Sequence, residues 1–472
     1  MKSDRLRFVD AMKELPPAWP DDLFPSVQAA VRQSGVKVVV LDDDPTGTQT
    51  VFGVPVLTEW PVAALQAELA NDLPAFYLLT NTRSLLLPEA RALNEEIGRN
   101  LVQAAKATGR NFVVVSRSDS TLRGHFPGEL DALVATLAEP FDAWIIAPFF
   151  LEGGRYTFND VHYVADGEWL VPAGDTPYAR DATFGFKSSN LRQWVAEKTA
   201  GRVAADSVAS ISIEDIRLGG PEQVRERLLG LPTGSICVVN AVSMQDLAVF
   251  VRGLLMAEAN GRRYLYRTAA SFVSVRASIP SRPLLTLEEL NLPASGGGMF
   301  VVGSYVPKST TQVSALLDQP DVNGVEINVQ ALLSDAERAV EIERAAAAAN
   351  ALLAKNEDVV LFTSRHLITG PDAEKSLKIG QSISEGLIAI VRAITVRPRY
   401  LLAKGGITSS DVATKGLDIK RAMVMGQILP GVPAWQTGPE SRHPGLAYIV
   451  FPGNVGRTDA LVMIRSSLQT RG

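Results

Sequence analysis

Residues 36–47 read Val-Lys-Val-Val-Val-Leu-Asp-Asp-Asp-Pro-Thr-Gly, an apolar run that ends in three carboxylates and a turn. An apolar run without polar alternation is typical of a strand buried on both faces of a parallel sheet. Similar short runs recur along the chain, separated by longer helical stretches, at residues 75–79, 111–115, 143–146, 235–239, 264–267, 299–302, 359–362, 400–402 and 446–450. The alternation predicts an α/β fold with mostly parallel sheets flanked by helices.

The length of the chain favours two domains. Its 472 residues are about three times the usual length of one domain. Two stretches rich in proline, glycine or serine, residues 279–283 and 293–298, bracket a short polar segment, as a linker would. We therefore expect an N-terminal domain over residues 1–280, a linker over 281–298 and a C-terminal domain over 299–472.

Two segments between the strands carry signals of their own. Residues 155–187 are rich in Gly, Pro, Tyr and Asp and have little periodicity, so we expect a long loop or an irregular excursion there. Loops of that length inside a compact domain tend to be functional. Residues 334–337 read Ser-Asp-Ala-Glu, a capping-box pattern that predicts the start of a helix reaching about Lys355.

Composition and charge exclude several classes of protein. The chain is 46% hydrophobic and 21% charged, which is typical of a globular rather than a disordered protein. Its net charge of −5 gives no electrostatic reason to expect nucleic-acid binding. No apolar run is long enough to cross a bilayer, and residues 1–25 do not resemble a signal peptide. The short apolar runs predict no membrane partner. Because Cys237 is the single cysteine, we expect no disulfides and a cytoplasmic protein.

Three carboxylates, Asp42, Asp43 and Asp44, follow the first strand directly. In open α/β sheets, ligands bind beyond the carboxyl ends of the strands. Carboxylates placed there can hold Mg²⁺, orient a sugar hydroxyl or accept its proton. A helix cap and a tight turn would explain one Asp and Gly47, but hardly three adjacent acids. We therefore interpret the cluster as functional and leave the division of roles among the acids open.

Polar loops that carry arginines follow the next strands. Residues 116–125 read Ser-Arg-Ser-Asp-Ser-Thr-Leu-Arg-Gly-His; Arg123 could bind a carboxylate in bidentate fashion and Asp119 could bind hydroxyls. A polar loop that merely caps a helix is the alternative, and this loop alone does not decide between them. Arg83 and Arg155 lie in the loops after two further strands. Because parallel strands bring such loops to one edge of the sheet, we expect a joint site for an anionic, polyhydroxylated substrate.

Glycine turns follow three strands of the C-terminal half, at residues 302–304, 404–410 and 451–456. Their backbone N–H groups are suited to phosphate. A single glycine turn is usually only a turn, but three on successive strands favour a nucleotide pocket. The chain contains no P-loop, no Gly-x-Gly-x-x-Gly between a strand and a helix, and no protein-kinase motif pair.

Taken together, these loops resemble the four-carbon acid sugar kinase family, formerly a domain-of-unknown-function group, over about residues 36–463. Residues 119–124 are similar to the family's Asp-Ser-Thr-Leu-Arg-Gly, which is the most specific element. Residues 42–47 are similar to its Asp-Asp-x-Thr-Gly, with one residue more before the Thr, and 147–155 resemble its Pro-Ala-Phe-Pro…Gly-Arg segment. The resemblance implies phosphorylation of sugar acids such as D-erythronate and D-threonate with ATP and Mg²⁺. It also implies substrate binding in the N-terminal domain and nucleotide binding in the C-terminal domain.

The chain departs from the family pattern at several positions. Residues 48–50, Thr-Gln-Thr, replace an acid that is usual there; Arg117 stands where Lys is common and His125 where Asn is common. Lys404-Gly405-Gly406 replaces the usual Ser-Gly-Gly. The changes near the substrate indicate a divergent branch that would accept a related branched or oxo sugar acid, such as 3-oxo-isoapionate.

These observations lead to a specific hypothesis about the site. We expect an acid among Asp42, Asp43 and Asp119 to position or deprotonate the attacking hydroxyl. The residues expected to bind the sugar acid are Arg83, Ser120, Arg123 and Arg155. Those expected to contact ATP are Gly303, Ser304, Lys404, Gly405, Gly406, Ile407, Thr408, Gly453 and Asn454. The metal ligands stay open, and a homodimer is compatible with the hypothesis. The alternatives are a sensor that binds a sugar acid and a nucleotide without turnover, and a dehydrogenase or lyase of the same metabolites.

Overall fold

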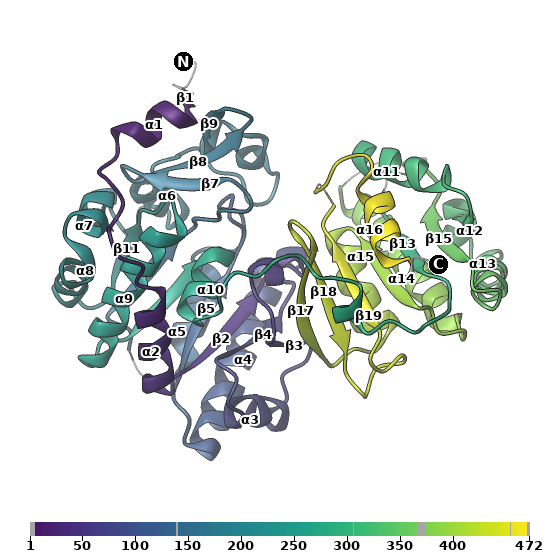
Figure 1. Ribbon diagram of the computed structural model, residues 1–472, viewed down its shortest axis with the longest axis horizontal. Coiled ribbons are helices and arrows are strands. Elements are labelled where there is room, and N and C mark those ends of the chain that lie inside the picture. The colour runs from purple at the N-terminus through teal and green to yellow at the C-terminus, as the bar shows by residue number, and fades with distance from the viewer. Residues whose placement is uncertain are drawn as a thin grey trace. The chain divides into compact units, whose positions relative to one another are not determined.

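The computed structural model describes residues 5–137, 140–304, 306–365, 368, 373–453 and 455–469 (Figure 1). The chain divides into two compact units, Met1–Ser281 and Arg282–Gly472. Each unit contains a mostly parallel sheet with helices on its faces. The predicted α/β class is confirmed. No helix in these described ranges is long and apolar enough to span a membrane.

A parallel sheet forms the centre of unit 1. Its strands are β2 (Lys37–Asp42), β3 (Pro55–Leu57), β4 (Ala75–Leu79), β5 (Phe112–Arg117), β6 (Ala143–Ala147), β10 (Ala209–Ile211), β11 (Ser235–Val239) and β12 (Tyr264–Thr268). Their spatial order is β10-β11-β6-β12-β5-β2-β4-β3. After β2 the chain first forms β3 and β4 on one side of that strand and then β5 on the other side. The β2–β5 boundary is therefore a topological switch point. Ligands bind at such points in open α/β sheets.

Helices cover both faces of this sheet. One face carries α3 (Val62–Ala70), α4 (Leu87–Thr108), α5 (Gly128–Thr136) and α6 (Leu191–Lys198); the other carries α2 (Phe24–Ser34), α9 (Met244–Ala259) and α10 (Ala270–Arg276). Leu265 belongs to the core under the first group. Its neighbour Tyr266 points to the opposite face, where its ring lies 5.3 Å from Phe272 of α10. Figure 1 shows α2 beside α9, although the two helices are far apart in the sequence. The short helices α1 (Phe8–Glu14), α7 (Ile213–Arg217) and α8 (Gly220–Leu229) complete the unit.

Residues 155–172 form a small antiparallel sheet, so the prediction of a long loop or an irregular excursion over 155–187 was wrong for this part. The strands are β7 (Arg155–Phe158), β8 (Val161–Asp166) and β9 (Trp169–Pro172), and β1 (Leu6–Arg7) pairs with β9. Asn159 and Asp160 both have positive φ and close the β7–β8 hairpin with a two-residue turn. Beyond β9, up to Lys187, the chain has only the 3₁₀ turns η3 (Ala173–Asp175) and η4 (Pro177–Arg180).

Unit 2 has its own sheet, with parallel strands and an antiparallel edge. The strands are β13 (Met299–Val302), β14 (Val322–Ile327), β15 (Asp358–Thr363), β16 (Tyr400–Lys404), β17 (Arg421–Leu429), β18 (Val432–Thr437) and β19 (Ala447–Phe451). Their order is β17-β18-β19-β16-β13-β15-β14, and β18 runs antiparallel to both of its neighbours. Because β13 lies between β15 and β16, the β13–β16 boundary is the switch point of this sheet.

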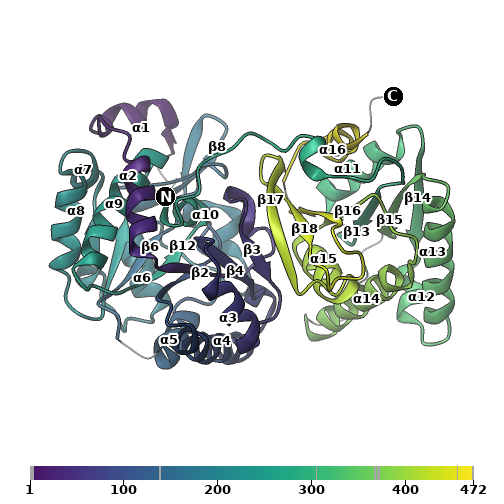
Figure 2. The same ribbon diagram turned by 60° about the horizontal axis from the view of Figure 1, so that its bottom comes forward.

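The helices of unit 2 are α11 (Pro307–Leu317), α12 (Val329–Leu333), α13 (Arg338–Leu353), α14 (Ala373–Ala393), α15 (Gly406–Asp411) and α16 (Ala460–Leu468). Figure 2 shows α11 next to α16, and both pack on one face of the sheet. Residues 282–298 lie along this unit: Leu285 and Leu290 join its core, and the Leu285 N–H donates to the Gln427 carbonyl.

The predicted capping box at residues 334–337 does not form. The helix α13 begins at Arg338, and the residue before it, Glu337, makes no capping hydrogen bond. A separate short helix, α12, precedes it and is capped by the Asn328 side chain. The Arg338 side chain donates to the Leu332 carbonyl at the end of α12, which fixes the corner between the two helices.

Candidate active site

Asp42 is a buried carboxylate at the end of β2, with 2% of its surface exposed. It accepts a hydrogen bond from Arg117 of β5 at 3.0 Å. A Cβ at Gly47 would lie 2.0 Å from Oδ2 of Asp42, so the turn can pack on this carboxylate only because residue 47 is glycine. Burial, helped by the neighbouring carboxylates Asp43 and Asp44, raises the pKa of Asp42 to about 7 against the opposing charge of Arg117.

Asp43 has one carboxylate oxygen with a hydrogen-bond donor and one without. Its Oδ2 accepts from the Ser118 hydroxyl at 2.9 Å. Its Oδ1 is buried and has no hydrogen-bond partner in the described parts of the chain. The nearest cations to Oδ1 are Arg83 and Arg117, each at 3.8 Å, which is too long for a hydrogen bond. Buried polar atoms are normally hydrogen-bonded, so this oxygen is suited to bind a hydroxyl that comes from outside the chain.

Asp119 is held by two arginines. Its carboxylate lies 3.3 Å from Arg83 and accepts from Nε of Arg123 at 2.8 Å, and the Thr121 hydroxyl donates to it as well. Burial alone would raise the pKa of Asp119, but these cations and the hydroxyl outweigh it and hold the pKa well below its usual range. Asp119 therefore stays ionised and orients the two arginines.

Arg83 connects the acid-bearing loops that follow β2 and β5. It lies in the 3₁₀ turn η2 (Thr82–Ser84) after β4. Its guanidinium pairs with Asp44 and Asp119 and lies 3.8 Å from Asp43. The predicted residues Asp42, Asp43, Asp119, Arg83 and Arg123 are thus brought together by direct contacts between the β2, β4 and β5 loops.

Ser120 and two histidines belong to the frame of these loops. The Ser120 side chain is buried, and its carbonyl lies 2.7 Å from Nε2 of His162. His125 lies with Nε2 at 3.1 Å from the Thr82 carbonyl and 3.0 Å from the Leu85 carbonyl. The two imidazoles therefore brace the backbone around Ser120 and around Arg83.

Arg267, on β12, is a site residue that the sequence analysis did not assign. It is 3% exposed and donates to the Ser118 hydroxyl at 3.2 Å and to the Arg123 carbonyl at 3.1 Å. Its guanidinium lies over the ring of Trp194 at 5.0 Å. The available signal was an arginine at the end of an otherwise apolar strand, which is expensive to bury unless it is used.

Tyr178 and Asp181 were also missed. Tyr178 lies in η4, and the guanidinium carbons of Arg123 and Arg155 lie 5.1 and 5.7 Å from its ring centroid. The Asp181 carboxylate lies 3.7 Å from Arg123. The expectation that the irregular segment after residue 155 is functional was the signal that could have found them.

In unit 2, the turns after β13, β16 and β19 meet. A Cβ at Gly303 would lie 2.5 Å from Oγ1 of Thr408, and one at Gly405 would lie 3.5 Å from Cβ of Ser304. Lys404 donates from Nζ to the Gly453 carbonyl at 3.2 Å. Most of the residues expected to contact ATP are therefore neighbours in space. The remaining ones are Gly406, which opens α15, Ile407, whose side chain is 61% exposed, and Asn454, which lies outside the described residues.

Lys404 is fully buried without a carboxylate partner among the described residues. Its Nζ donates to the carbonyls of Pro452 and Gly453 and lies 4.2 Å from the centroid of the Phe451 ring. Burial, together with repulsion from Lys308, lowers the pKa of Lys404 to about 7. The ammonium is therefore held between carbonyl groups that do not neutralise it.

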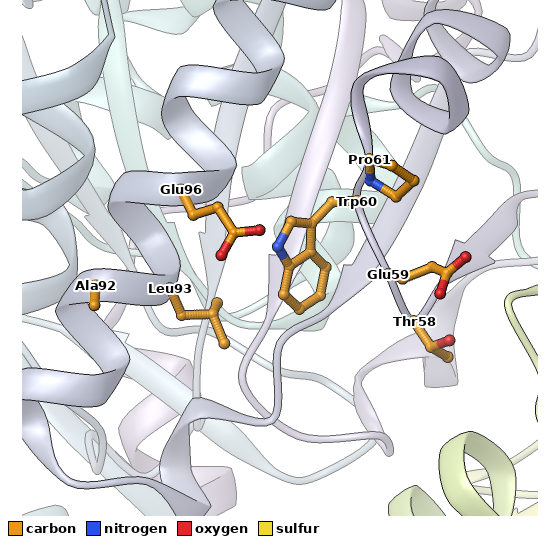
Figure 3. A pocket seen from close by; sticks show the side chains of 7 residues that line it. All are labelled: Thr58, Glu59, Trp60, Pro61, Ala92, Leu93 and Glu96. Atoms are coloured by element: carbon orange, nitrogen blue, oxygen red, sulfur yellow. The ribbon is translucent and has the colours of Figure 1, made fainter.

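Two hollows lie outside these polar clusters. Figure 3 shows one of about 530 Å³, in which the Trp60 ring points towards Leu93 and Glu96 of α4. A second, of about 660 Å³, is lined by Lys308, Ala315 and residues 456–459, close to the glycine turn after β19. None of the residues predicted for either site lines these hollows, so the polar contacts rather than the hollows mark the candidate site. Among the described residues, no group of three or more His, Cys, Asp or Glu side chains is arranged to hold a metal ion.

Two family models match the chain and together cover most of it. The model described as "Sugar-binding N-terminal domain" matches residues 38–276, and the one described as "Nucleotide-binding C-terminal domain" matches residues 299–461. The chain belongs to the four-carbon acid sugar kinase family. The recognition based on the loop motifs is thereby confirmed.

A curated relative in this family is a D-erythronate kinase from Heliobacterium modesticaldum. It is 26% identical to the chain over 314 residues, which cover 65% of this chain and 66% of the relative. The match therefore spans just under two thirds of the relative's length.

Solved structures show the same fold. A Haemophilus influenzae protein from a family of unknown function superposes with a TM-score of 0.61 at 19% identity, covering 91% of this chain and all of that one. A Salmonella typhimurium protein, provisionally named a tRNA synthase, gives a TM-score of 0.68 at 16% identity, covering 92% of this chain and all of that one. At such identities the similarity concerns the fold alone.

Proposed function

We propose that this member of the family is a kinase that transfers the γ-phosphoryl group of ATP to a hydroxyl of a small sugar acid. Candidate substrates are D-erythronate, D-threonate and related branched or oxo sugar acids such as 3-oxo-isoapionate. Unit 1 would bind the sugar acid and unit 2 the nucleotide. The observation that carries the proposal is Oδ1 of Asp43, a buried carboxylate oxygen that lies amid paired arginines and has no hydrogen-bond donor among the described residues.

In this proposal Asp43 accepts the proton of the attacking hydroxyl. The hydroxyl oxygen then bonds to the γ-phosphorus, the bond from that phosphorus to the β–γ bridging oxygen breaks, and ADP leaves. Ser118 holds Oδ2 of Asp43 and so orients Oδ1. Asp119 is unsuited to be the base, because Arg83 and Arg123 hold its pKa too low for it to take up a proton readily and occupy its oxygens.

The glycine turns and Lys404 of unit 2 would bind the phosphates. The Lys404 ammonium donates to two carbonyls and has no carboxylate partner among the described residues, so a phosphate oxygen would supply the missing negative charge. Mg²⁺ usually binds to substrate phosphates and one or two carboxylates and keeps several waters, so it does not require a preformed protein cage. Mg²⁺ would neutralise part of the phosphate charge. We expect such an ATP-dependent enzyme in the cytoplasm.

The test is ADP release with ATP and Mg²⁺ across a panel of sugar acids with three to six carbons, including oxo and branched acids. We expect a single strong response, and Asp43→Asn should lower kcat at least about 100-fold. Asp131→Asn is the matched control, since Asp131 pairs with Arg202 outside the site. ATP binding without ADP release for any sugar acid would contradict the proposal and favour the sensor.

A further inference from the structure

Arg155 differs from the other arginines of the unit 1 site. Arg83, Arg117 and Arg123 each pair with at least one aspartate. Arg155 has neither an ion pair nor a side-chain hydrogen bond within the described residues, and its Nε is buried. Arg267 also lacks an ion pair, but its N–H groups already donate to Ser118 and to a carbonyl.

A half-buried guanidinium without an anion loses hydration that nothing in the described chain replaces. The planar fork of an arginine matches the two oxygens of a carboxylate, and the Arg155 guanidinium makes no hydrogen bond or ion pair to the described residues. Arg123, in contrast, already donates from Nε to Asp119. The contacts therefore single out Arg155 as the receptor for an anion that does not belong to the protein.

Tyr178 holds this receptor in place. Its ring contacts the guanidiniums of Arg155 and Arg123 at 5.7 and 5.1 Å. Such cation–π contacts favour a fixed position of the cation over the ring. The turn that carries Tyr178 is connected to the loop after β5, since Asp181 just after the turn lies 3.7 Å from Arg123 of that loop. The backbone of Arg155 is fixed separately by two hydrogen bonds with Phe150.

We propose that Arg155 binds the carboxylate of the sugar acid and that Tyr178 is a positioning residue that holds Arg155 for this contact. The inference rests on the proposed function, because it assigns the acid end of the same substrate. Arg123 connects the two ends of the site: it pairs with Asp119 beside Arg83 and lies over Tyr178 beside Arg155. A sugar acid would thus have its carboxylate near Tyr178 and a hydroxyl near Asp43.

Calorimetry with a charged and a neutral ligand tests this assignment. The ligands are D-erythronate and erythritol, a neutral polyol with the same number of carbons; if another panel acid turns over faster, that acid and its polyol replace them. Arg155→Gln should weaken binding of the acid about 30-fold or more and leave the polyol within about twofold. Tyr178→Leu should weaken the acid about tenfold, while Tyr178→Phe, which keeps the ring, should stay close to the wild type.

The control and a second variant separate this role from a structural one. Arg202→Gln removes a guanidinium that also lies near an aromatic ring, at 6.0 Å from Trp144, and should leave both affinities unchanged. Arg155→Lys keeps the charge without the fork and should bind the acid with intermediate affinity. In every variant KM for ATP should stay at the wild-type value, and the thermal midpoint reports whether the variant is folded.

Two results would overturn the inference, and they differ in what they say about the kinase. The first is that Arg155→Gln binds the acid as tightly as the wild type does, or that it loses the same affinity for the acid and for the polyol. Either outcome would contradict the assignment of the carboxylate to Arg155, while ADP release by the wild type would still support the proposed function. A wild type that neither binds nor phosphorylates any sugar acid of the panel would contradict both.

Discussion

The Ser118 hydroxyl donates to Oδ2 of Asp43 at 2.9 Å, while Oδ1 of the same carboxylate accepts no hydrogen bond from the part of the chain that the structure describes. The serine therefore decides which oxygen of Asp43 is available to a substrate. Arg267 donates to the same hydroxyl oxygen, and of the two acceptors near the hydroxyl hydrogen, Oδ2 of Asp43 at 2.9 Å is closer than the Arg123 carbonyl at 3.3 Å. Arg267, Ser118 and Asp43 are thus connected in this order by hydrogen bonds. The oxygen at the end of the series, Oδ1 of Asp43, accepts no hydrogen bond from the described residues.

Replacing Ser118 with Ala should lower kcat. Asp43 could then rotate, because neither oxygen would have a hydrogen bond, and the base would be less often in position. We expect a loss of about tenfold, or about 1.4 kcal/mol of transition-state stabilisation, with KM for ATP unchanged. Ser210→Ala is the matched control, since Ser210 donates to Asp160 away from the site. Wild-type kcat in Ser118→Ala would contradict the role given to Asp43.

Asp119→Asn should destabilise unit 1 in a pH-dependent way. Arg83 and Arg123 hold the pKa of Asp119 below its unfolded value, so the ionised form stabilises the fold above about pH 4. This contribution is lost as the pH falls through the folded pKa. We expect the variant to be about 3 kcal/mol less stable at neutral pH, with a smaller difference at pH 3. Urea unfolding at both pH values measures it.

The exposed pair between Asp131 and Arg202 provides the control for this experiment. Asp131→Asn should change the free energy of unfolding by less than about 1 kcal/mol at either pH. Equal stability of the wild type and Asp119→Asn at pH 7 would show that the fold does not need the charge of Asp119 to hold Arg83 and Arg123.

Gly303→Ala should weaken nucleotide binding and leave sugar-acid binding intact. The added methyl group would lie 2.5 Å from Oγ1 of Thr408, so the turns after β13 and β16 would have to separate. We expect ATP affinity to fall at least about tenfold by calorimetry. Gly380→Ala in α14 is the control, because a Cβ there meets no atom within 4 Å. Loss of sugar-acid affinity as well would mean that the substitution disturbs more than the nucleotide turns.

The parallel strands could be read from the sequence because they are buried on both faces and therefore continuously apolar. The predicted runs 75–79, 235–239 and 299–302 coincide with β4, β11 and β13. The strand β17 was missed for the opposite reason. Buried and less buried residues alternate along β17, but the less buried positions include the apolar residues Met423 and Met425. The sequence therefore does not show the alternation of apolar and polar residues that predicts such a strand. The strands β7 to β9 are short, and their hairpin depends on turn residues within a stretch that is rich in such residues throughout.

The candidate site could be predicted as far as it depends on loops that follow strands. Asp43, Arg83 and Asp119 come from separate loops, and parallel topology alone brings those loops together. Arg267 and Tyr178 could not be found in this way. Arg267 is a single arginine in a strand, and it joins the site through Ser118, more than a hundred residues away in the sequence. Tyr178 lies in an irregular turn, and it joins the site through Arg155, about twenty residues away.

In the proposed function, where Lys404 binds the ATP phosphates, we expect nucleotide binding to depend on pH. In the free protein, burial keeps the pKa of its ammonium near 7, and carbonyls of Pro452 and Gly453 hold it. A phosphate beside Nζ would favour the charged form, so binding would take up a proton near pH 7. We expect ATP affinity to fall above pH 7, approaching tenfold per pH unit. Lys404→Met should bind ATP more weakly, and its affinity should change less with pH.

Lys308→Met, which removes the exposed neighbouring charge, should keep the steep dependence of ATP affinity on pH. Calorimetry at pH 7.5 in two buffers of different ionisation enthalpy measures the proton directly. Equal proton uptake by the wild type and Lys404→Met would show that Lys404 does not meet the phosphates.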